Sequence, residues 1–525
     1  MLRLLLAACL VLAWAATLRA AERPNVILII SDDLNTQPLR DGSPVRVPTP
    51  NIDRLRAAGV SFGNAHAVSP ICGPSRACFL TGYLPQTSGY WGWKQQRNDW
   101  RDNQLLRRAP TFIAQARDHG YRIAGGGKIF HNGHEDWNVF KQDGELRYGP
   151  RPSFGPYAVT APKGPMWKRW TTHPAFPGMK PYDHYCPLSL VPVTDGHAGW
   201  GIERGTFRYE GPDQRDPMPD EELARWAAGW LNSEQDDQRP FLLCVGFNRP
   251  HQPFVVPDEY FDRLPLDAVQ PVPTPPEDGF QTAPSLQPPE PDTWTRGGVR
   301  RYPKVLERDG DLRQWTRAYQ ACVSFVDDQI GVILAGLADS PHAENTVVIL
   351  TSDHGYHMGE KKRLWKNTVW EPATAVPFLV AGPGVAAGAE VVHPVSLVDL
   401  YPTIQELCAL PEQRGADLPP LDGTSLVPLL RDPDAAWDGP AVALSTVPPD
   451  DEPSADLAEA IPQQHWSVRD RRYRYVRASR GGVELYDLAT DPWEHRNRAD
   501  DPTLAEVRAR LHRELEQRVG VSLTP

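Results

Sequence analysis

Three apolar runs, far apart in the chain, constrain the fold more than any other feature of the sequence. They occupy residues 25–30, 240–247 and 345–350. Apolar residues follow one another in each run without alternation, which is typical of strands buried on both faces of a parallel sheet. Patterns typical of helices lie between and around the runs, at residues 49–59, 111–120, 217–231, 314–337 and 398–407. The sequence therefore predicts an α/β fold with a doubly wound, mostly parallel sheet flanked by helices.

Charged and imidazole side chains follow each run directly. They are Asp32 and Asp33, Arg249 and His251, and Asp353 and His354. Ligands bind at the carboxyl ends of the strands in open α/β sheets, so we expect these side chains to share one edge of the sheet. Oxygen donors suit a hard dication such as Ca²⁺, whereas an imidazole donor keeps Mg²⁺ and Mn²⁺ open. A helix cap or a solvated turn is the ordinary alternative for an Asp pair.

Residues 69–82 contain a cysteine at a predicted helix start. Pro74 suits the first turn of a helix, so Cys72 is expected just before the helix N-terminus. Backbone N–H groups and the helix dipole favour negative charge there, which suits a nucleophile that attacks an anionic ester. A lone cysteine is more often a small buried side chain, so this pattern alone leaves both interpretations open.

A glycine-rich segment, residues 125–127, follows a predicted strand at 121–124 and precedes Lys128 and His131. We interpret it as a turn from which these two side chains project toward an oxyanion. A flexible loop with a solvated lysine is the alternative.

The order Cys-x-Pro-Ser-Arg followed by Leu-Thr-Gly, at residues 72–82, resembles the maturation motif of the formylglycine-dependent (type I) sulfatases. The resemblance spans nearly the whole mature chain. It is strongest to the iduronate-2-sulfatase branch, through Gly-Lys-Ile-Phe-His at 127–131 and Pro-His-Gln-Pro-Phe at 250–254. It implies an alkaline-phosphatase-like fold. It also implies that a formylglycine-generating enzyme or an anaerobic sulfatase-maturating enzyme converts Cys72 into formylglycine (3-oxoalanine).

The resemblance further implies the role of each candidate residue. The metal ligands would be Asp32, Asp33, Asp353, His354 and the modified Cys72. Arg76 would steady the formylglycine, and His131 would orient it or assist elimination. Three residues would neutralise the ester oxygens: Lys128, His251 and Lys366. One of them would also protonate the leaving alkoxide. Arg249 takes the place of a substrate-binding lysine of the family, and Asn248 departs from the histidine of the family pattern.

The N-terminus has the pattern of a secretory signal at residues 1–21, with Arg3 before an apolar run and small residues at its end. The run is too short to cross a membrane, so we expect an exported protein, periplasmic or secreted, without stable membrane insertion. A lipobox-like sequence around Cys9 leaves lipidation open. The remaining cysteines do not suggest a disulfide framework.

The 525 residues suffice for one large and one smaller domain. Composition changes near residues 432–439, and alternating patterns beyond it are typical of antiparallel strands. We therefore expect a catalytic domain at 22–435 and a small α+β subdomain with an antiparallel sheet at 436–525. The segment 134–216 is rich in tryptophan, and we interpret it as substrate-facing loops.

The formal net charge of −11 argues against nucleic acid as the main partner and requires any anion site to be locally basic. The resemblance implies an exo-acting sulfatase that removes sulfate from a sulfated oligosaccharide, a uronate 2-O-sulfate or a related polysaccharide-derived glycan. Two alternatives are a phosphonate monoester or phosphodiester hydrolase of the same superfamily and an inactive relative that binds sulfated glycans. Neither Cys72 nor a metal-binding aspartate is missing, which disfavours the inactive relative.

Overall fold

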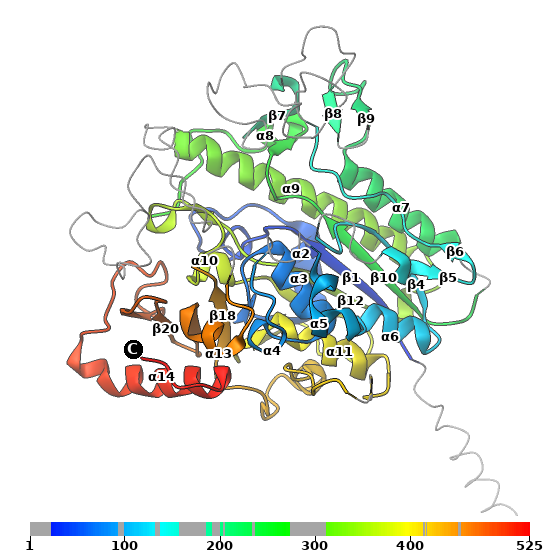
Figure 1. Cartoon of the computed structure of the whole chain (residues 1–525). Coiled ribbons are helices and arrows are strands. Elements are labelled where there is room, and N and C mark those ends of the chain that lie inside the picture. Colours follow the sequence, from blue (N-terminus) through cyan, green and yellow to red (C-terminus); the bar gives the residue numbers. More distant parts are fainter. Residues whose placement is uncertain are drawn as a thin grey trace, which may run out of the picture.

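A seven-stranded sheet lies at the centre of the computed structural model of the chain (Figure 1). The residues that the structure describes are 23–92, 99–131, 137–156, 185–191, 200–202, 205–233, 237–273, 311–412, 415, 417–449 and 453–524. Across the sheet the strands are β16 (Ala389–Val391), β2 (Gly59–Phe62), β15 (Phe378–Ala381), β12 (Thr346–Ser352), β1 (Asn25–Ser31), β10 (Phe241–Phe247) and β4 (Arg122–Gly127). The three apolar runs are therefore β1, β10 and β12, which are neighbours.

The sheet is mostly parallel, as predicted. Strand β1 pairs in parallel with β10 on one side and with β12 on the other, and β4 extends the parallel order beyond β10. Strand β15 is antiparallel to both of its neighbours. Ser31 at the end of β1 lies opposite Phe247 of β10 and Ser352 of β12. The residues after these three strands consequently meet at one edge of the sheet.

Helices cover both faces of the sheet (Figure 1). Alternate residues of β1 pack into two different cores, which is why the strand carries apolar residues at successive positions. Ile27 and Ile29 share a core with helices α2 (Pro50–Ala58), α7 (Pro219–Ser233) and α9 (Asp311–Ala338). Val26, Leu28 and Ile30 face the other core, with helices α3 (Cys72–Thr81), α6 (Phe112–Asp118) and α11 (Leu400–Leu407).

Among the described helices, only α9 is long and apolar enough to meet the length and composition of a membrane span, over Leu312–Ala338. Of its apolar window, 67% is buried inside the protein, as expected for a core helix.

The glycines at 125–127 do not form the predicted turn, because they are the last residues of β4. A Cβ atom on Gly125 would lie 2.4 Å from the Phe140 ring, and one on Gly127 would lie 2.0 Å from the carbonyl oxygen of Gly246 in β10. Gly127 also has a φ of +70°. These glycines therefore allow close packing of β4 rather than a flexible loop.

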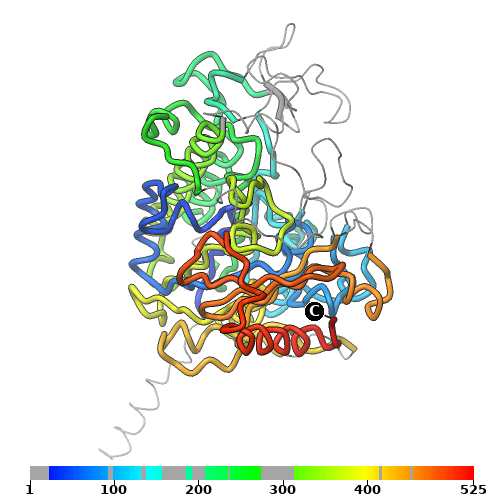
Figure 2. The backbone as a smooth tube through the Cα atoms, turned by 90° about the vertical axis from the view of Figure 1, so that its left-hand side faces the viewer, coloured from blue at the N-terminus to red at the C-terminus, as the bar shows by residue number. Residues whose placement is uncertain are grey.

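A four-stranded antiparallel sheet forms the C-terminal part of the chain, as predicted. Its strands are β18 (Ala443–Val447), β19 (His465–Arg469), β20 (Tyr473–Arg477) and β21 (Val483–Asp487), and helix α14 (Ala505–Val519) packs on it. Figure 2 shows this sheet, in orange and red, beside the yellow-green segment that follows β12. The predicted domain boundary at 435/436 stays a prediction.

The shorter described elements connect these parts. They are β3 (Ala65–His66), α4 (Pro85–Ser88), α5 (Gln104–Arg108), β5 (Lys141–Gln142), β6 (Glu145–Leu146), β7 (Tyr185–Pro187), β8 (Trp200–Ile202), β9 (Gly205–Phe207), β11 (Phe254–Val256), α8 (Asp258–Asp262), β13 (His357–Met358), β14 (Leu364–Trp365), α10 (Glu371–Thr374), β17 (Val395–Ser396), α12 (Val427–Arg431) and α13 (Leu457–Ala460).

Candidate active site

Cys72 is the first residue of helix α3, and Ile71 is the N-cap. The prediction that Cys72 precedes the helix is thus wrong by one position, because the hydrogen bond from the Ser75 N–H to the Ile71 carbonyl, 3.0 Å, already closes a helical turn around it. The side chain of Cys72 nevertheless lies in the first turn, where free N–H groups favour negative charge. Only 5% of this residue is exposed.

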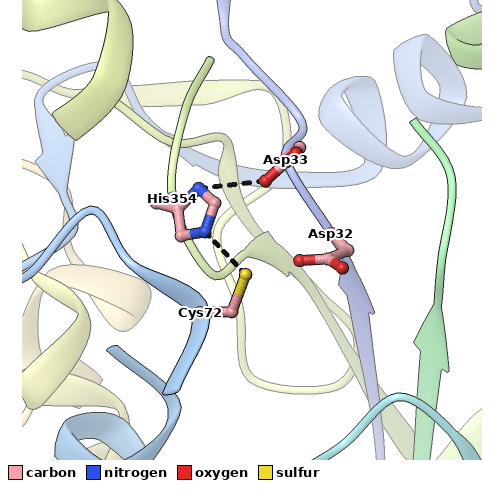
Figure 3. Close-up of side chains that lie close together, drawn as sticks. All are labelled: Asp32, Asp33, Cys72 and His354. Carbon is pink, nitrogen blue, oxygen red and sulfur yellow. Dashed lines mark hydrogen bonds and ion pairs between the residues drawn. The ribbon is translucent and has the colours of Figure 1, made fainter. Parts of the chain in front are cut away.

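Asp32 and Asp33 directly follow β1 and face Cys72 together with His354 (Figure 3). Ligand atoms of these four buried residues all lie within 4.8 Å of one another. The His354 ring lies between Asp33 and Cys72, with Nε2 3.2 Å from Sγ and Nδ1 3.3 Å from Asp33 Oδ1. Asp353 joins the group, since its Oδ1 accepts a hydrogen bond of 3.2 Å from the Asp33 backbone N–H.

The tautomer of His354 follows from its surroundings. Nδ1 lies 3.0 Å from the carbonyl oxygen of Gly355. A carbonyl oxygen only accepts, so Nδ1 carries the proton and Nε2 presents its lone pair to the cluster. This arrangement, with one ring nitrogen bonded to a carbonyl and the other turned to the site, is the usual one for a metal-binding histidine.

Two lysines reach the carboxylate pair. The ammonium group of Lys128 contacts Asp32 Oδ2. The Nζ atom of Lys366 lies 2.5 Å from Asp33 Oδ1 and 3.2 Å from Cys72 Sγ. Lys128 is 2% exposed and Lys366 is 16% exposed, so both charges lie in an environment that screens them weakly.

Arg76, four residues after Cys72 on α3, binds two carboxylates. Its Nε lies 3.0 Å from Asp353 Oδ2 and its Nη2 lies 3.4 Å from Asp32 Oδ1. Its Nη1 also donates to the carbonyl oxygens of Lys128 and Ile129. The guanidinium therefore orients Asp32 and Asp353 and the residues directly after β4, and its predicted support of the formylglycine stays a prediction.

The ionisable groups of this cluster differ in pKa. Burial raises the pKa of a carboxyl, but for Asp32 the charges of Lys128, His251 and Arg76 outweigh burial and hold its pKa well below the usual range. For Asp33, burial prevails over the charges of Lys366 and His354 and raises the pKa to about 7. Burial and the neighbouring Asp32 charge also raise the pKa of the Cys72 thiol, so an unmodified Cys72 is not a thiolate at neutral pH.

His251 and His131 lie beside the same cluster. His251 Nε2 is 3.8 Å from Asp33 Oδ2, while its Nδ1 lies 2.7 Å from the carbonyl oxygen of Gln252 and so carries the proton. Burial and the charge of Lys128 hold the pKa of His131 well below its usual value. The predicted contact of His131 with the nucleophile stays a prediction.

The buried guanidinium of Arg249 is directed to backbone carbonyls. It donates to the oxygens of Val255, Phe154 and Gly155 at 3.2, 3.3 and 3.1 Å. The predicted substrate contact of Arg249 stays a prediction, whereas these bonds fix the segment that carries Phe154. The Phe154 ring lies 4.8 Å from Lys128 Nζ and 5.0 Å from the His251 ring, measured to its centroid.

Sequence reasoning missed Phe154 because a single aromatic residue in an irregular segment carries no local signal. Asp220, in the first turn of α7, accepts hydrogen bonds from the backbone N–H groups of Asn248 and Arg249, at 3.0 and 2.9 Å. It thereby holds the loop after β10. Of the tryptophan-rich segment, Trp137 stacks on Tyr148 with centroids 5.5 Å apart. The residues at 157–184 and the side chain at 200 lie outside the described residues.

Comparison with known proteins shows what this chain is similar to. The "Sulfatase" family model matches residues 24–409, and the model "N-sulphoglucosamine sulphohydrolase, C-terminal" matches residues 359–520. A sulfatase of Formosa agariphila is 31% identical over 494 residues, covering 92% of this chain and 84% of that protein. The human iduronate 2-sulfatase is 28% identical over 423 residues, covering 74% and 69%.

Among solved structures, a 2-O GAG sulfatase superposes with a TM-score of 0.60 at 21% identity, covering 95% of this chain and 93% of that one, which shows the fold alone. The sheet topology and this likeness define an alkaline-phosphatase-like fold. The chain belongs to the sulfatase family. It is an enzyme that hydrolyses sulfuric esters.

Proposed function

We propose that this sulfatase removes sulfate from a terminal sugar of a sulfated glycan, and that a uronate 2-O-sulfate is its substrate. One observation carries the proposal: Cys72 Sγ, in the first turn of α3, lies 3.2 Å from both Lys366 Nζ and His354 Nε2 in a buried site. Relatives named iduronate 2-sulfatase support the choice of sugar.

The residues present fit a divalent metal. Ligand atoms of Asp32, Asp33 and His354 lie within 4.8 Å of one another, and the His354 tautomer leaves the lone pair of Nε2 available to a metal. Three carboxylates, with Asp353, supply oxygen donors, for which reason Ca²⁺ is the proposed metal rather than Mg²⁺ or Mn²⁺. The bound metal would supply a Lewis acid that polarises the ester.

The carboxylates and cations of the described site are equal in number. Above the Asp33 pKa of about 7, where Asp32, Asp33 and Asp353 are all ionised, their charges are balanced by three cations, Arg76, Lys128 and Lys366. A divalent metal therefore adds an excess of positive charge, which an anionic sulfate ester offsets. This balance explains how a protein with a net charge of −11 binds an anion.

The Sγ atom of Cys72 marks the place of the hydroxyl oxygens of hydrated formylglycine, the nucleophile that we propose. We assign Lys128 and Lys366, which contact Asp32 and Asp33, to neutralising ester oxygens, and His251 Nε2 lies 3.8 Å from Asp33 Oδ2. One of these three groups protonates the leaving alkoxide.

The test uses the full chain co-produced with a maturation enzyme, with formylglycine at Cys72 quantified by peptide mass spectrometry. Oligosaccharides sulfated at defined positions, with a uronate at the non-reducing end, are compared with an aryl sulfate and an aryl phosphonate monoester. We expect release of sulfate from the 2-O position and no activity in Cys72→Ala. A large preference for the phosphonate would identify a phosphonate hydrolase. Binding without turnover by fully converted protein would identify an inactive relative.

We also propose that residues 1–21 are removed during export. Intact mass and N-terminal peptide analysis of protein from its host should show Glu22 as the first residue. A lipid attached to Cys9 would contradict this and indicate a membrane-anchored form.

A further inference from the structure

The loop at residues 359–367, here called the Lys366 loop, has an unusual backbone. Of the eight non-glycine residues with positive φ in the described chain, four lie in it, namely Lys361 (53°), Lys362 (56°), Trp365 (71°) and Asn367 (66°). Such conformations disfavour residues with a Cβ, and each costs about 1–3 kcal/mol unless its surroundings enforce it. The question is which contacts hold this loop in place.

One side of the loop belongs to the active site. Lys366 extends to Asp33 Oδ1 at 2.5 Å and to Cys72 Sγ at 3.2 Å. The next residue, Asn367, donates its backbone N–H to the carbonyl oxygen of Pro70 at 3.1 Å, two residues before Cys72. The loop therefore reaches the nucleophile through Lys366 and its immediate neighbour.

The other side of the loop inserts Lys361 into the C-terminal sheet. Lys361 is 1% exposed, and its Nζ lies 4.7 Å from the Trp370 ring centroid and 4.2 Å from that of Tyr486 in β21. It donates to Tyr486 Oη at 2.9 Å and to the carbonyl oxygen of Glu494. Desolvating an ammonium group is unfavourable, so these two rings and two oxygens must offset a considerable cost.

The same sheet, together with Glu494 beyond β21, also holds the segment after Lys366. The Trp370 indole N–H donates to Glu484 Oε2 at 2.7 Å, and the Glu371 N–H donates to Glu494 Oε2 at 2.9 Å. Arg474 of β20 donates to the Val369 carbonyl oxygen at 3.0 Å. Lys366 thus lies between two attachment points on the C-terminal sheet.

We propose that Lys361 is a positioning residue for the reaction: by anchoring the strained Lys366 loop to β21, it sets the place of the Lys366 ammonium group beside Cys72. The C-terminal sheet is then a working part of the active site rather than a separate module. The inference rests on the proposed function, since it assigns the loop to the same site.

The chain offers a matched control in Lys362. It is the same residue type, adjacent, with nearly the same φ, but it is exposed to solvent. Lys361→Met should lower kcat/KM by about 10–100-fold, since a displacement of about 1 Å can cost about 10²-fold. Lys362→Met should change it less than about twofold. Both variants are measured with an aryl sulfate at equal formylglycine content.

A double-mutant cycle separates positioning from general destabilisation. If Lys361 acts through Lys366, adding Lys361→Met to Lys366→Met should leave kcat/KM unchanged from that of Lys366→Met alone. Independent, additive losses would overturn the proposal. Equal activities of Lys361→Met and Lys362→Met would overturn it as well, and an inactive wild-type protein would instead contradict the proposed function.

A second variant keeps the test decisive if Lys361→Met fails to fold. Tyr486→Phe removes one acceptor of the Lys361 ammonium group but retains the ring, and Tyr473→Phe, in the neighbouring strand β20, is its control. We expect a loss of kcat/KM only in Tyr486→Phe, and this loss should disappear when Lys366→Met is also present. Equal activity of the two tyrosine variants would refute the positioning role.

Discussion

Replacing Lys366 by methionine removes the most exposed of the three cations that face the carboxylates, at 16% exposure, and retains much of the side-chain volume. A sulfate oxygen in contact with Cys72 Sγ would lie roughly 4 Å from Nζ, because Nζ itself is 3.2 Å from Sγ. Two unit charges at ~4 Å interact by about 4 kcal/mol at an effective dielectric constant of ~20. An ester oxygen carries only part of a charge, so we expect a loss of about 3 kcal/mol, or about 10²-fold in kcat/KM.

The assay measures aryl sulfate hydrolysis by wild type, Lys366→Met, Lys366→Arg and the exposed-loop control Lys362→Met. Formylglycine content, metal content and Tm are measured on each preparation, since a change in any of them would also lower activity. Lys366→Arg should retain part of the activity because it restores the charge but not the position of Nζ. A loss of less than about fivefold in Lys366→Met, with full formylglycine and metal content, would refute the assigned role of this charge.

The remaining predictions concern pH, the Phe154 segment and the metal. Burial raises the pKa of Glu360 from 4.5 to about 7, so the folded protein binds this proton more tightly than the unfolded chain, and the associated stability is lost as pH rises through that window. Glu360→Gln should therefore increase the free energy of unfolding at pH 8 by up to about 3 kcal/mol, and so raise Tm there. Near pH 4.5 it should leave Tm unchanged. Calorimetry at both pH values is the measurement, and an equal gain at both would contradict this prediction. Arg249→Met should free the Phe154 segment and lower kcat/KM by about tenfold or more at unchanged formylglycine content. Phe154→Ala should cause a similar loss, and the double variant should lose no more activity than either single variant. Additive losses would argue against a shared role. Removal of the metal by a chelator should abolish turnover and lower Tm, and Ca²⁺ should restore both at lower concentration than Mg²⁺.

The central sheet and most of the candidate site were predictable from the sequence because their signals are local. The three central strands β1, β10 and β12 are continuous apolar runs, and the side chains after them converge because these strands are parallel neighbours in register. The Cys72 segment carries its own motif. The register alone then places Asp33 and His354 together, 321 residues apart in the chain.

The contacts that position the site were not predictable, because they join residues without a pattern of their own. Lys361 resembles a solvated lysine in sequence, yet it is buried between Trp370 and Tyr486. The glycines at 125–127 look like a turn, although the neighbouring Phe140 ring and β10 require their small size. In both cases the reason lies in a partner more than ten residues away, which no local propensity reveals.

Arg76 lies in the maturation-like segment and also in the buried charge cluster. It belongs to the segment that resembles a maturation motif, yet in the folded protein 1% of it is exposed and its guanidinium binds Asp32 and Asp353. Cys72 is equally inaccessible at 5% exposure. The maturation enzyme that we propose would have to contact both residues, so in a folded chain this buried site would first have to open. We therefore propose that Cys72 is modified before the chain folds, so that Arg76 would serve first in recognition and afterwards as the counter-charge that orders Asp32 and Asp353.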